Sequence, residues 1–200
     1  MSSKEIQLEK ITEYVKHKFS NDTTGHDYFH LERVVNNATK IAIEEEANLF
    51  ITIAAAWLHD IADHKLTNNQ ENELNELSQF LHQLGLQHSQ IEAIMTIINT
   101  TSYSKGIIPS TIEGKIIQDA DRLDALGAIG LARAFAYGGS NQRAIYDPTK
   151  SSGSTIHHFY EKLLLLKDSM HTNTGRMIAI ERHQYMQKFL QHFFKEWEGE

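Results

Sequence analysis

Apolar residues recur at helical spacing along most of the chain, and proline almost never interrupts them. Only two of the 200 residues are prolines, so long helices are sterically permitted. The clearest stripe follows the i, i+3, i+4 spacing of an amphipathic helix and contains Leu31, Val34, Val35, Ala38, Ile41 and Ala42. Asp27 lies ahead of this stripe and is expected to cap the helix. We find no convincing strand pattern. The sequence therefore predicts an all-α protein.

The most apolar segment, residues 50–63, ends in the sequence AAAWLHDIAD. Because it is apolar nearly all round, it predicts a central helix that other helices surround. His59 and Asp60 lie inside this apolar sequence. Removing an unpaired charge from water costs several kcal/mol, so this pair must find a partner within the protein.

The remaining patterns predict one all-α domain over residues 1–200. Its core covers about residues 24–130, and it includes a helix that begins with a capping box, Ser110 to Glu113. The longest polar stretch follows at 139–154. Two C-terminal helices are expected within 154–197, the first along an apolar stripe over 156–166.

Charge and composition narrow the possible functions. The net charge is −7 with no basic stripe, which disfavours duplex nucleic acid as a partner. The chain has no cysteine, so disulfides and thiolate metal ligands are excluded. No secretory signal and no apolar run of membrane-spanning length is present. We expect a cytoplasmic protein that is a monomer or a homodimer.

Polar residues on three predicted helices could form a metal site. One of these helices carries His30, and the central helix carries His59 and Asp60. The third of them has the sequence IIQDADRLDAL. Two imidazoles and two carboxylates suit Mn²⁺, Fe²⁺, Co²⁺ or Mg²⁺ better than a closed structural zinc site. Each histidine could instead be an ordinary hydrogen-bonded core residue.

The third helix offers three carboxylates, and its periodicity does not choose among them. Asp124 lies on the apolar arc of the helix, while Asp119 and Asp121 flank that arc on opposite sides. Asp124 could alternatively pair with an arginine, and Arg122 is close by in sequence.

These residues resemble the H…HD…D signature of the HD-domain metal-dependent phosphohydrolase superfamily. The match is His30 in HLERV, His59 and Asp60 in WLHDIAD, and Asp121 in DADRL. Longer blocks, such as IIQDADRLDALGAIGLARAF, resemble the bacterial small stand-alone subfamily, some members of which are nucleoside triphosphate pyrophosphohydrolases that use Mn²⁺. The resemblance extends from about residue 10 to residue 197.

The resemblance implies roles for individual residues. His30, His59, Asp60 and Asp121 are the expected metal ligands, for Mn²⁺ first and otherwise Mg²⁺, Co²⁺, Fe²⁺ or Ni²⁺. Asp63 matches an acidic position that orients or deprotonates the attacking water, although the family often has Glu there. A bound ion would activate that water and polarise a phosphoryl oxygen.

Further residues are expected to contact a phosphorylated substrate, most simply a nucleotide. They are His26, Arg33, Lys65, Asp124, Lys105 in SYSKG and Arg143 in the polar stretch. Several have structural alternatives: His26 could cap a helix, Lys65 could be a helix-end cation, and Arg33 could tie helices together.

Hydrolysis of (deoxy)nucleoside triphosphates to monophosphate and pyrophosphate is the first hypothesis for function. A second keeps the fold and changes the substrate to a nucleoside monophosphate, a cyclic nucleotide or ppGpp. A third is a metal-stabilised regulatory module without turnover. Asp63, one helical turn from the HD pair, argues against the third.

Overall fold

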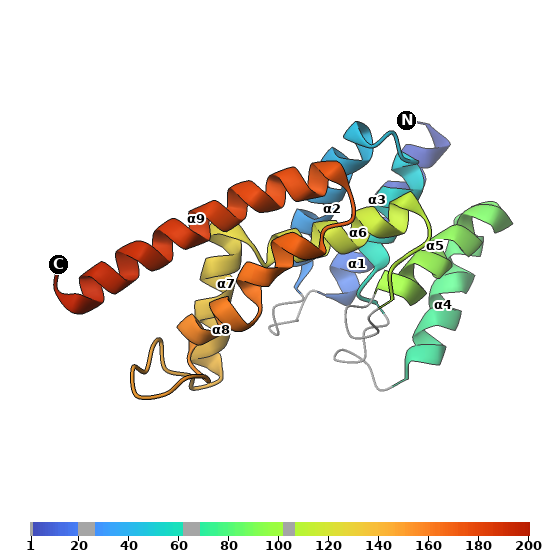
Figure 1. Ribbon diagram of the computed structural model, residues 1–200. Helices are drawn as coiled ribbons and strands as arrows, with labels where there is room; N and C mark the ends of the chain where they lie inside the picture. The colour runs from blue at the N-terminus through green and yellow to red at the C-terminus, as the bar shows by residue number, and fades with distance from the viewer. Residues whose placement is uncertain (1, 20–26, 62–68, 102–106) are drawn as a thin grey trace. The chain divides into compact units, whose positions relative to one another are not determined.

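The computed structural model describes residues 2–19, 27–61, 69–101 and 107–200, and the described residues form helices and no strand (Figure 1). The all-α prediction is confirmed. The chain gathers into two compact units, Met1–Ala120 and Asp121–Glu200, whose boundary falls within the helix α6 (Ile112–Asp124). The predicted single domain over residues 1–200 stays a prediction. None of the described helices has the length and hydropathy that a membrane span requires.

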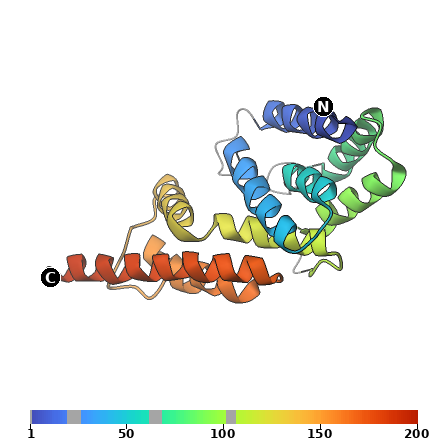
Figure 2. The same cartoon turned by 90° about the horizontal axis from the view of Figure 1, so that it is seen from above.

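The first unit is built around α3 (Leu49–Leu58), which packs against three other helices (Figure 2). They are α1 (Ser3–Lys18), α2 (Tyr28–Glu44) and α5 (His88–Thr101). A further helix, α4 (Gln70–Gln83), packs on α5. Eight of the ten residues of α3 are buried. A helix apolar on every side gains most when neighbours surround it, and the predicted central position is confirmed.

The second unit contains α7 (Gly127–Ser140), α8 (Thr155–Glu161), the 3₁₀ helix η2 (Leu163–Ser169) and the long α9 (Asn173–Glu198). α9 packs against α7 and η2. Phe159, which is fully buried, lies between Phe135 of α7 and Phe189 of α9, with ring centroids 5.8 and 6.1 Å away. These aromatic contacts join three elements of the unit around one buried ring.

The turn between α6 and α7 depends on two glycines. Gly127 has a φ of +73°, a conformation that side chains with a Cβ rarely adopt. A Cβ at Gly130 would lie 2.2 Å from the carbonyl carbon and oxygen of Ala125. The first turn of α7 therefore lies directly against the backbone that leaves α6.

Gly130→Ala should destabilise the protein through this close approach. We expect the free energy of unfolding to fall by about 2–3 kcal/mol, because the new methyl group meets backbone atoms that cannot rotate away. Gly139→Ala in the same helix is the matched control, since nothing lies within 4 Å of its Cβ. It should be neutral or slightly stabilising. Urea unfolding of both variants checks the prediction, and equal stability of the two would contradict it.

His183 of α9 should make stability depend on pH. Burial lowers the pKa of His183 and Lys167 lowers it further, whereas Asp168 acts in the opposite direction. The folded state therefore disfavours the charged ring. Neutral His183 therefore makes its full contribution to the free energy of unfolding above the unfolded pKa of about 6.5. That contribution is lost as the pH falls from there toward the lower pKa of the folded state.

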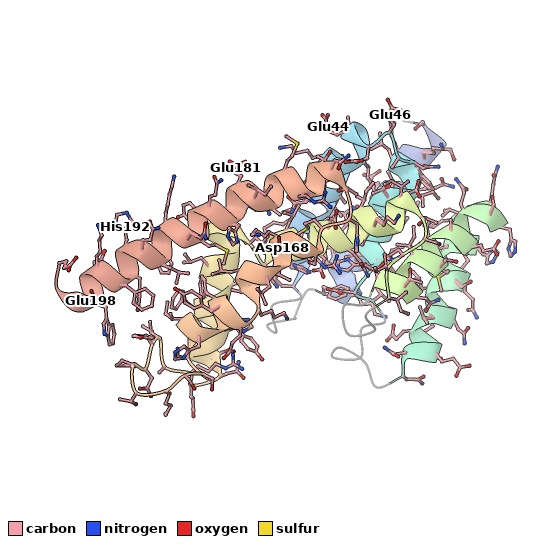
Figure 3. The ribbon with its side chains drawn as sticks, viewed as in Figure 1. Glu44, Glu46, Asp168, Glu181, His192 and Glu198 are labelled. Atoms are coloured by element: carbon pink, nitrogen blue, oxygen red, sulfur yellow. The ribbon has the colours of Figure 1, made fainter. Side chains whose placement is uncertain are left out.

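The measurement is urea unfolding of wild type and His183→Gln at pH 7.5 and 5.5. The decline between the two pH values should be smaller in the variant. Exposed His192, on the solvent side of α9 in Figure 3, supplies the control His192→Gln, which should decline as wild type does. An equal decline in His183→Gln and wild type would contradict the prediction.

Candidate metal centre

The N-terminus of α2 fixes the position of His30. Asp27 is the N-cap, and its carboxylate accepts a hydrogen bond of 2.8 Å from the backbone N–H of His30, as the sequence predicts. Tyr28 stacks on Trp57 of α3, with ring centroids 5.4 Å apart. This contact joins the start of α2 to the end of α3. Burial raises the pKa of Tyr28, and the Glu32 carboxylate raises it further, so the phenol stays neutral.

His59 lies at the end of α3 and not within it, because the helix stops at Leu58. The expected helix over 50–63 is therefore too long at its C-terminus by at least the three residues 59–61. The Nδ1 atom of His59 lies 2.8 Å from the Ala56 carbonyl, and the backbone N–H of Ile61 donates to the Leu58 carbonyl at 3.2 Å. The carbonyls of Ala56 and Leu58, in the last turn of α3, therefore have partners although the helix does not continue.

The contact with Ala56 also selects the tautomer of the His59 ring. A carbonyl only accepts, so Nδ1 carries a proton, and in the neutral ring Nε2 then presents a lone pair. This buried Nε2 makes no hydrogen bond to a described residue. An imidazole held in this way is oriented as a metal ligand.

Asp60 places its carboxylate beside both imidazoles. Its Oδ1 lies 3.3 Å from Nε2 of His59, and its Oδ2 lies 3.5 Å from Nε2 of His30. All three residues are less than 10% exposed. A carboxylate oxygen facing an imidazole lone pair is repelled unless a cation is present, so the arrangement favours a positive charge at this point.

Asp121 completes the group of donors. The ligand atoms of His30, His59 and Asp121 all lie within 4.8 Å of one another. Asp121 lies within α6, and this group includes neither the fully buried Asp119 nor Asp60, whose carboxylate lies beside both imidazoles. The donor set is two nitrogens and the oxygens of two carboxylates, which fits a divalent first-row ion. Such an ion would be held by His30, His59, Asp60 and Asp121.

The predicted substrate residues have different fates. Arg33 is half-buried on α2, one turn after His30. Asp124 is 1% exposed and forms an ion pair with Arg133. Arg143 is exposed, with its guanidinium carbon 5.5 Å from the ring centroid of Tyr137. Their roles in binding stay predictions. The remaining predicted residues lie outside the described ones: His26, Asp63, Lys65 and Lys105.

The sequence does not predict the contacts that two arginines make with α6. Arg133 pairs with Asp124, and Nη1 of Arg182 donates to the Leu123 carbonyl at 2.6 Å. The sequence contains a weak signal for the first, since a carboxylate on an apolar arc needs a partner. We find no signal for the second, because its partner is a backbone carbonyl 59 residues away.

Comparison with known proteins agrees with this geometry. Residues 27–126 match the HD domain family. YpgQ of Bacillus subtilis (strain 168), itself uncharacterised, is 38% identical over 197 residues, which cover 96% of this chain and 95% of YpgQ.

Two solved structures resemble the chain along nearly its whole length. An HD-superfamily hydrolase from Bacillus thuringiensis gives a TM-score of 0.88 at 43% identity, covering 98% of this chain and 100% of that one. Bacillus subtilis YpgQ in complex with ADP gives 0.85 at 35% identity, covering 98% and 97%.

The chain belongs to the HD-domain family. It is a metal-dependent phosphohydrolase, and its relatives include the bacterial YpgQ-like proteins. HD domains bind divalent metal ions, and the His30, His59 and Asp121 group is suited to hold one here.

Proposed function

We propose that the protein hydrolyses (deoxy)nucleoside triphosphates to a monophosphate and pyrophosphate, with Mn²⁺ as the preferred ion. The observation that carries the proposal is the buried donor set around Asp60, whose carboxylate lies within 3.5 Å of both imidazoles. An ion bound there would activate water and polarise a phosphoryl oxygen. The complex of Bacillus subtilis YpgQ with ADP supports a nucleotide as the ligand.

The chain's own residues would perform the other tasks. His59, whose Nδ1 contacts the Ala56 carbonyl, and His30, whose backbone N–H is capped by Asp27, would each supply a ring nitrogen to the ion. Asp63 would orient the attacking water and take its proton. His26, Arg33, Lys65, Lys105, Asp124 and Arg143 are the residues proposed to contact the substrate.

The test is product analysis of the metal-stripped protein with dNTPs and NTPs, after addition of Mn²⁺, Co²⁺ or Mg²⁺. We expect monophosphate and pyrophosphate in equal amounts. Reaction in ¹⁸O-labelled water adds the position of attack: label in the monophosphate indicates the α-phosphorus, and label in the pyrophosphate indicates the β-phosphorus.

Other products would change the assignment. Orthophosphate as the sole small product would indicate a phosphatase. Turnover of only monophosphates, cyclic nucleotides or ppGpp would move the function to a nucleotidase or a phosphodiesterase. Tight binding of one ion without turnover of any of these compounds would indicate a regulatory module.

A further inference from the structure

We propose that Arg182 is a positioning residue for Asp121 and that it acts through the C-terminal carbonyls of α6. The inference rests on the proposed function, in which Asp121 is a metal ligand. It concerns contacts within residues 121–200, where arginines from two other helices reach the end of α6.

The last turn of α6 needs support of this kind. The helix ends at Asp124, so Asp121 lies in its last turn, where the regular helical hydrogen bonds come to an end. From the backbone, the Leu123 carbonyl accepts a tighter, three-residue bond from the N–H of Leu126, at 3.1 Å. Helix ends fray, yet a metal ligand must stay within roughly 0.5 Å of its productive position.

Arg182 supplies a second bond at this point. Its Nη1 donates to the Leu123 carbonyl at 2.6 Å, which places a cation at the negative end of the α6 dipole. Its aliphatic stem passes over Gly127, where Cγ lies only 3.0 Å from the position that a Cβ would take. The glycine therefore gives the arginine its access to the end of the helix. Figure 3 labels the neighbouring Glu181 on the exposed side of α9.

Two more arginines tie the same turn. Arg133 of α7 forms an ion pair with the carboxylate of Asp124 and lies 3.5 Å from its carbonyl oxygen. Arg122 reaches away from the helix, and its Nη1 donates to the Ser169 carbonyl at 2.9 Å. The three residues that follow Asp121 are thus each held from outside the helix. Since Asp121 shares their helical turn, its backbone is held with them, and the backbone sets where the carboxylate starts.

The experiment compares three full-length variants: R182M, R182K and R176M. Arg176 is the matched control, because it also lies on α9 and donates to a carbonyl, that of Met170 at 3.2 Å, which is outside α6. The readouts are the Kd for Mn²⁺ by calorimetry, the visible spectrum with Co²⁺, and thermal melting in a chelator. A purely structural role would alter the melting and leave the Kd and the spectrum unchanged.

We expect R182M to weaken Mn²⁺ binding by about 10- to 100-fold and to change the Co²⁺ spectrum. R182K keeps the stem and one donor and should weaken binding by a smaller factor. R176M should bind as wild type does. Wild-type affinity in R182M would overturn the inference, as would equal weakening in R182M and R176M.

If R182M does not fold, the Kd of R182K for Mn²⁺ is the deciding measurement. Wild-type affinity in R182K would then overturn the inference. Failure of the proposed function is distinguishable from these outcomes. If the wild-type protein turns over no triphosphate to pyrophosphate but still binds the ion, the proposed reaction fails and the comparison of Arg182 variants still tests the inference. If the wild-type protein binds no divalent ion, the inference falls. Should wild type bind the ion while the Arg182 variants bind it equally well, only the inference fails.

Discussion

Asp60→Asn should reduce metal-dependent hydrolysis by roughly 10³-fold or more, because the loss of one charged ligand removes several kcal/mol of transition-state stabilisation. Asp60 is 7% exposed, and its carboxylate oxygens lie 3.3 and 3.5 Å from the two imidazoles. Asparagine keeps the volume and removes the charge, which separates the ligand role from packing. Steady-state kinetics with saturating Mn²⁺ and a nucleoside triphosphate provide the measurement.

Asp168→Asn is the matched control for this substitution. Asp168 is exposed on η2, where its carboxylate pairs with Lys167 (Figure 3). The control should keep wild-type kcat and KM. Activity of Asp60→Asn within tenfold of the control would contradict a ligand role for Asp60.

Removal of the metal ion should abolish activity and also lower stability. An ion that binds only the folded state at 100 times its Kd contributes about 2.7 kcal/mol, which for a chain of this size raises Tm by roughly 5–10 °C. The buried carboxylate and the paired imidazoles make the effect large, because they repel one another less once a cation is bound. Scanning calorimetry of the stripped protein with and without Mn²⁺ measures the shift.

Specificity of the shift is tested with two comparisons. Asp60→Asn should lose most of the increase in Tm, and Asp168→Asn should keep it. A chelator added to the loaded wild-type protein should restore the lower Tm and stop the reaction. An unchanged Tm on loading, with activity unaffected by the chelator, would contradict a metal-dependent site.

Local sequence predicts the helices well where a single chemical pattern dominates. The all-round apolar sequence of α3 predicts its central position, and Asp27 predicts the start of α2. The start of α6 is less accurate: the capping side chain is Thr111, one residue beyond the expected Ser110, and its hydroxyl accepts from the N–H of Gly114 at 3.1 Å. Adjacent hydroxyl residues offer nearly equal caps, and packing decides between them.

The apolar spacing of the sequence does not predict α7. Its sequence, GAIGLARAFAYGGS, contains four glycines, which disfavour an isolated helix. Two of them are required by neighbours: a Cβ at Gly130 would meet the Ala125 backbone, and one at Gly138 would lie 2.2 Å from the hydroxyl of Thr155. Contacts made after folding stabilise a helix that its own propensities do not favour.

The apolar stripe over 156–166 predicts one helix, and the chain instead forms α8 and then η2. The break lies at Lys162, whose φ of −139° leaves the helical region. The sequence around it contains no glycine or proline. The tighter 3₁₀ turn is set by packing on α9.

The sequence by itself determined the residue types of the metal centre and the helices that carry them, because amphipathic spacing and a His-Asp pair in an apolar segment are local features. Helical spacing left Asp119 and Asp121 open, and only the family resemblance favoured Asp121; the tertiary structure groups Asp121, and not Asp119, with His30 and His59. Both carboxylates flank the apolar arc of α6, so a rotation of the helix exchanges their surroundings. That rotation is fixed by the groups that α6 contacts, and those groups come from distant parts of the chain.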